Sequence, residues 1–138
     1  MSFGSFLKLY GATALVFFAV DLVWLGIVAQ KFYQKHLGHL LAPEVRWGPA
    51  ILFYLIFIAG LVVFALMPAL ASASPTRATI LGAFLGFFAY ATFDLTCAAL
   101  FRDFPTVVVV VDMIWGTVLS GIVCTVGYHL GRLLGLGG

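Results

Sequence analysis

The chain has 138 residues, of which 64% are hydrophobic and only 9% are charged. Soluble domains carry about 25% charged residues, so this composition excludes a soluble globular protein and indicates an integral membrane protein. The formal net charge is only +2, and no cluster of Lys and Arg marks a nucleic-acid or polybasic lipid patch. We therefore expect the lipid bilayer, and no nucleic acid, around this chain.

Four segments are apolar enough to cross a membrane as helices, which takes about 20 residues each. They cover residues 5–29, 49–70, 77–101 and 105–134. The first apolar run is longer than the core of a cleavable signal peptide, so we expect it to be retained. The sequence predicts a single-domain, all-α membrane protein over residues 1–138, with four transmembrane helices in an antiparallel bundle.

Prolines and polar residues mark the ends of the predicted helices. Pro49 and Pro105 stand where a first helical turn accepts proline. The segment 71–76, ASASPT, separates the second and third helices. The turn 101–105, FRDFP, is so short that the third and fourth helices must be antiparallel neighbours. The long connection 30–48 has spaced apolar residues and is predicted as an interfacial loop containing a short helix.

An even number of spans places both termini on one side of the membrane. We call this the terminal side, and we call the side that holds segment 30–48 the loop side. The basic residues divide into Lys8, Arg77 and Arg132 on the terminal side and Lys31, Lys35, Arg46 and Arg102 on the loop side. By the difference of one residue, the positive-inside rule favours a cytoplasmic loop side.

Three aspartates lie inside the predicted helices, Asp21 on the first, Asp94 on the third and Asp112 on the fourth. An aspartate at the bilayer centre costs roughly 2.5–3.5 kcal/mol on insertion scales, so each needs an explanation. By helix rise, all three lie about 10–12 Å below the loop side. Tyr54, on the second helix, falls near the same level. The four side chains are therefore expected to share one layer of the bundle.

Two helices carry stripes of small or polar residues in step with their aspartates. Every fourth position follows this pattern, at Gly82, Gly86, Tyr90 and Asp94 and at Asp112, Gly116, Ser120 and Cys124. Small residues let transmembrane helices approach closely, so we expect both stripes to face other helices rather than lipid. The three acids then point into the bundle, toward one pocket open to the loop side.

Close carboxylates at low dielectric cannot all be ionised, so this pocket is expected to hold a proton, a metal ion or the cationic part of a ligand. The candidate ligand-binding residues are Asp21, Asp94, Asp112, Tyr54, Tyr90, Trp24 and Trp115. The alternative is structural, with each aspartate accepting hydrogen bonds between helices and the tryptophans serving as packing or interface anchors. The sequence leaves both interpretations open.

A pair of histidines suggests a second candidate site. His36 and His39, in the motif HLGH, are three residues apart and share a face if their segment is helical. Such a pair binds metal ions in some proteins. It equally suits an amphipathic segment whose rings meet lipid headgroups.

Several motifs together resemble a family of small bacterial membrane proteins known as domain of unknown function 2177. They are DLVWLG, FYQKHLGHLL, LFYLIFIAGLVVFAL, GAFLGFFAYATFDLT and VVVDMIWGTVLS, and they cover nearly the whole chain. The resemblance implies four transmembrane helices in a bacterial inner membrane and a contextual link to membrane-lipid modification, but no reaction. It also implies asparagine and tryptophan where this chain has Cys97 and Phe104.

Three functions follow as hypotheses. The first is transport or relay of a cation or proton by the three acids, in a homo-oligomer because four helices enclose a narrow path. The second is a membrane enzyme or binding protein for a lipid headgroup or metal, using the acids with His36 and His39. The third is an accessory subunit of a larger membrane complex. No hydrolase, zinc-protease or nucleotide-binding motif is present, so neither a catalytic residue nor a cofactor is predicted.

Overall fold

The computed structural model describes residues 1–137, which form long helices and no strand. Four of these helices are long and apolar enough to cross a membrane. In chain order, they are α1 (Phe3–Trp24) continued by η1 (Leu25–Ala29) and α2 (Gln30–Leu37), α3 (Trp47–Leu61) continued by η2 (Val62–Leu66) and α4 (Met67–Ala71), α5 (Pro75–Leu100), and α6 (Thr106–Leu133). The fold is therefore an all-α membrane architecture with four candidate spans, as the sequence predicts.

The first helix differs from the prediction at its end. The sequence placed an interfacial loop over residues 30–48, but α2 continues the first helix to Leu37, giving one helix of 35 residues. Residues 30–37 are mostly polar and contain neither proline nor glycine. Their polarity ends the apolar run without interrupting the backbone hydrogen bonds. At 1.5 Å per residue the helix is about 52 Å long, so it tilts in, or projects from, a hydrocarbon core about 30 Å thick.

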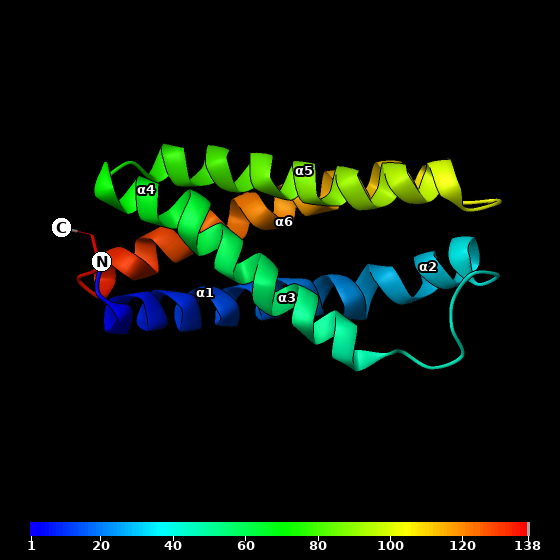
Figure 1. The fold of residues 1–138 in the computed structure, drawn as a ribbon, viewed down its shortest axis with the longest axis horizontal. Helices are drawn as coiled ribbons and strands as arrows, with labels where there is room; N and C mark the ends of the chain where they lie inside the picture. Colours follow the sequence, from blue (N-terminus) through cyan, green and yellow to red (C-terminus); the bar gives the residue numbers. More distant parts are fainter. Residues whose placement is uncertain (138) are drawn as a thin grey trace.

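Both ends of the chain lie at the same end of the bundle, beside the turn that joins α4 to α5 (Figure 1). Residues 38–46 and the turn between α5 and α6 lie at the opposite end. The most extensive contact is between α5 and α6, and α1 packs mainly against α6. In Figure 1 the helix formed by α3 and α4 crosses the others obliquely.

The terminal half of the bundle is a closed apolar core. Its most buried side chains are Leu9, Phe17, Ile58, Leu61, Leu66, Leu119 and Val123, none of which is exposed. The buried aspartates all lie in the loop-side half. Burial therefore divides the molecule into a mainly apolar half, which also encloses the hydroxyls of Thr13 and Ser120, and a half that encloses the carboxyl groups.

The two stripes of small residues meet where α5 packs on α6. A Cβ atom added to Gly82 would lie 2.6 Å from the Cβ of Cys124, and one added to Gly86 would overlap the carbonyl oxygen of Gly116 and the side chain of Ser120. Contacts this close require hydrogen at these positions. The glycines thus set the distance between the two helices that carry Asp94 and Asp112.

Candidate functional site

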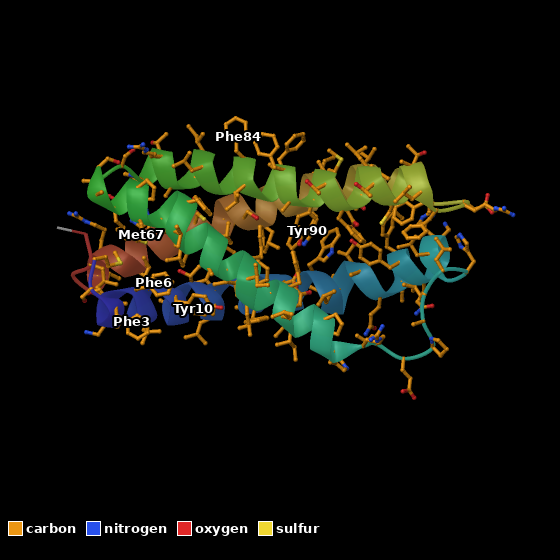
Figure 2. All side chains as sticks on the ribbon, in the orientation of Figure 1. Phe3, Phe6, Tyr10, Met67, Phe84 and Tyr90 are labelled. Carbon is orange, nitrogen blue, oxygen red and sulfur yellow. The ribbon has the colours of Figure 1, made fainter. Side chains whose placement is uncertain are left out.

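A cavity of about 470 Å³ lies among all four helices in the loop-side half of the bundle. It is lined by Asp21, Trp24, Leu25, Tyr33, Phe53, Tyr54, Ala89, Tyr90, Phe93, Asp112 and Trp115. Six of the seven candidate ligand-binding residues line this cavity. The seventh, Asp94, is buried beside it. Figure 2 shows Tyr90 pointing from α5 toward the interior of the bundle.

The motifs VDLVW and VDMIW meet across the antiparallel helices α1 and α6. The rings of Trp24 and Trp115 stack, with centroids 4.4 Å apart and planes inclined by 9°. Trp115 also lies beside Asp21, while Tyr33 lies beside both Trp24 and Asp112. We call this arrangement the reciprocal Asp-x-x-Trp pair. Because Trp115 is one turn beyond Asp112 along α6, Asp21 lies about one turn, or 5 Å, deeper than Asp112.

Asp21 is enclosed by aromatic side chains. Its side chain is only 6% exposed, and the hydroxyl of Tyr54 and the indole of Trp115 lie beside its carboxyl group. The Trp115 Nε1–H does not reach hydrogen-bond geometry and has no partner among the described residues. The Tyr90 ring packs against Gly116, where the Cβ of any larger residue would overlap it. The Asp21 carboxyl group therefore faces the cavity with the Tyr54 hydroxyl beside it and with no basic side chain as a partner.

Asp94 and Asp112 form a pair of neighbouring carboxyl groups. Asp94 is fully buried, and within residues 1–137 neither of its oxygens has a hydrogen-bond donor. Asp112 is 7% exposed and accepts a hydrogen bond from the hydroxyl of Tyr33. No Lys, Arg or His in the part of the chain that the structure describes forms an ion pair with these acids or with Asp21. Two buried carboxylates side by side repel each other unless a proton or a cation lies between them.

Tyr33 is the cavity residue that sequence reasoning missed. It lies twelve residues after Asp21, which in a regular α-helix is about 120° away around the axis. Between them, η1 forms a π turn, Leu25–Ala29. A π turn bonds residue i to i+5 instead of i+4, so it accommodates one extra residue and reduces the offset to about 20°. The π turn therefore brings Tyr33 to the face that carries Asp21.

Comparison with known protein families shows which family the chain is related to. The family described as "Predicted membrane protein (DUF2177)" matches residues 6–129, which include the cavity and parts of all four helices. The chain belongs to this family. No match to this DUF2177 protein is found among curated proteins or solved structures. Its placement in a membrane as a multi-pass protein thus rests on the family and on the four apolar helices.

Cys97 is buried next to the carboxyl pair of this DUF2177 protein. The family resemblance implies an asparagine here, and a side-chain amide would offer two N–H donors to a neighbouring carboxylate. A thiol is only a weak donor. Phe104, at the place where tryptophan is implied, lies in the turn between α5 and α6 and does not line the cavity. The replacement at Cys97 is consistent with the absence of a donor on Asp94.

His36 and His39 of this DUF2177 protein make separate contacts. The His36 ring packs against Phe32 with centroids 4.7 Å apart, and His39 Nε2 lies 3.0 Å from the carbonyl oxygen of Asp103. Within residues 1–137 no group of three or more His, Cys, Asp or Glu side chains is arranged to hold a metal ion. His39 instead joins the segment after α2 to the turn between α5 and α6.

Proposed function

We infer that this protein binds a positively charged species, a cation or a proton, in the cavity among its four helices. The observation that carries this proposal is Asp94, whose carboxyl group is fully buried beside Asp112 with no donor. An aspartate retained as a structural acceptor would have hydrogen-bond partners, because buried polar groups almost always do. The polar neighbour of Asp94 is another acid, Asp112, and the two can pair only with a proton or a cation between them, which favours a binding role over a purely structural one.

The family resemblance supports a location for this activity. We propose a bacterial inner membrane, with the loop side facing the cytoplasm as the distribution of Lys and Arg favours. Transport or proton relay through four helices would require a second copy or a larger membrane complex to complete a path. A lipid-modifying enzyme remains the alternative class, supported by the contextual link to membrane lipids.

Neutralising the carboxyl pair is expected to abolish proton release on cation binding. A cation that enters the pocket displaces the proton shared by Asp94 and Asp112, because binding and protonation are linked. Na⁺, K⁺, Mg²⁺ and tetramethylammonium would each be added to purified protein in lightly buffered detergent while the pH is recorded. We expect at least one cation to release protons from the natural protein and none to do so from D94N/D112N.

The matched control is D103N, which neutralises an exposed aspartate in the turn between α5 and α6. Asp103 has a φ of 59°, a conformation that asparagine also accepts, so this variant is expected to fold and respond normally. A relay additionally predicts proton flux in proteoliposomes that D94N/D112N lacks. The proposal fails if neither proton release nor flux distinguishes D94N/D112N from D103N.

A further inference from the structure

The cavity is built mainly from aromatic rings. Seven of its eleven lining residues are Trp, Tyr or Phe, and only two are acids. Protein sites for Ca²⁺ are built mainly from several carboxylate and carbonyl oxygens, and within residues 1–137 no group of three or more His, Cys, Asp or Glu side chains is arranged to hold a metal ion. The volume of about 470 Å³ instead falls within the range of organic-ligand pockets, roughly 300–1,000 Å³. The lining therefore suits an organic cation better than a bare ion.

The rings are arranged around the acids in a way that suits an alkylated ammonium group. Trp24 and Trp115 stack on each other and both line the cavity, and Tyr54 and Tyr90 add two more rings to its wall. Aromatic faces attract ammonium groups through the cation–π interaction, most strongly where water is excluded. Asp21, buried and lining the cavity with no basic side chain as a partner, supplies the opposite charge.

The mouth of the cavity is apolar and faces outward. Leu25, Phe53 and Phe93 line the cavity and are 39%, 45% and 58% exposed, although they lie on three different membrane-spanning helices. Side chains exposed at this depth face hydrocarbon rather than water. The cavity thus has a charged, aromatic interior and an outlet that suits a hydrocarbon chain.

We propose that the ligand is an amphiphile with an alkylammonium head, held by the acids and indole rings of the reciprocal Asp-x-x-Trp pair, and a hydrocarbon tail that leaves past Leu25 and Phe93 into the bilayer. This inference rests on the proposed function, because it names the chemical class of the bound cation. A membrane lipid with an ammonium headgroup has this chemistry, whereas a soluble ammonium compound has the head alone.

A photoreactive probe tests the head and the tail together. The probe is dodecyltrimethylammonium with a diazirine in its chain, and the comparison compound has the same chain with a hydroxyl head. Each would be irradiated with the purified full chain in neutral detergent, and the labelled peptides mapped by mass spectrometry. We expect the ammonium probe to label peptides containing Leu25, Phe53 or Phe93 about tenfold more than the alcohol does, with excess tetramethylammonium reducing the labelling.

Variants connect the labelling to the site. D21N/D112N is expected to reduce rim labelling by the ammonium probe to the level of the alcohol, and D103N is expected to leave it unchanged. W24L is expected to weaken probe binding by roughly 2- to 30-fold, the range of a single cation–π contact, whereas W47L, at an exposed tryptophan, has no effect. Probe binding is followed by the dose dependence of labelling.

Three results would overturn the inference. Equal labelling by the ammonium and alcohol probes, or labelling that persists in D21N/D112N, would mean that the tail only joins the surrounding detergent. Proton release by tetramethylammonium without rim labelling would identify a soluble ammonium compound as the ligand. Proton release by metal ions alone would contradict the ammonium class while the proposed cation binding stands.

Discussion

Replacing Gly86 by leucine is expected to destabilise the protein by about 3 kcal/mol or more, the upper range for overpacking a tight interface. Even one added carbon would overlap the carbonyl oxygen of Gly116 and the side chain of Ser120. Backbone cannot yield in the way that the end of a long side chain can, so α5 and α6 must separate. Because Asp94 and Asp112 lie on these two helices, their pairing would be lost as well.

The measurement is unfolding by sodium dodecyl sulfate in mixed micelles, followed by tryptophan fluorescence. Gly11→Leu is the matched control, because a Cβ at Gly11 has no neighbour within 4 Å. We expect G86L to unfold at a clearly lower detergent fraction, while G11L behaves like the natural protein. Equal stability of the two variants would show that the close contact between α5 and α6 does not hold the bundle together.

Deleting Gly26 is expected to keep Tyr33 paired with Asp112. Gly26 lies in the π turn, so a chain without it can form a regular α-helix from α1 to α2. Tyr33 then lies eleven residues after Asp21, which at 100° per residue is an offset of about 20°, the same offset that the π turn gives in the natural protein. Tyr33 therefore stays on the cavity face, and Asp112 keeps its donor. Gly26→Ala keeps the residue count, and its Cβ has no neighbour within 4 Å, so it should retain the hydrogen bond.

A double-mutant cycle tests whether Tyr33 and Asp112 remain coupled after the deletion. In the natural protein, Tyr33→Phe is expected to reduce the free energy of unfolding by about 1–3 kcal/mol, the cost of leaving a buried acceptor without its donor. The same substitution should cost the same amount in the Gly26→Ala background and in the chain lacking Gly26. A cost close to nothing after the deletion would contradict the role assigned to the π turn.

The four membrane-spanning helices could be predicted because crossing lipid demands long apolar runs, which hydropathy reports directly. The end of the first helix could not, because residues 30–37 change from apolar to polar without any residue that stops a helix. Hydropathy therefore located the edge of the apolar region, while the helix continued beyond it to Leu37.

The candidate site was partly predictable for a similar reason. Repeats of four residues placed Gly86 and Gly116 on the faces where α5 meets α6, and with them Tyr90 and Asp112. Tyr33 could not be found this way, because the π turn shifts its angular position and leaves no mark in the composition. Nor does any pattern show that Asp94 lies beside the cavity rather than in its lining, since that depends on side-chain packing.

The reciprocal Asp-x-x-Trp pair has an electrical consequence. Its antiparallel geometry separates Asp21 from Asp112 by about one helical turn along the bundle, or roughly 5 Å of a hydrocarbon core about 30 Å thick. A full elementary charge that crosses the membrane changes in energy by about 2.3 kcal/mol per 100 mV. A proton or ammonium group that moves between these two acids would thus gain or lose only about 0.4 kcal/mol per 100 mV, less than thermal energy. Occupancy of the two positions would follow the chemistry of the cavity, and the membrane potential would change it little.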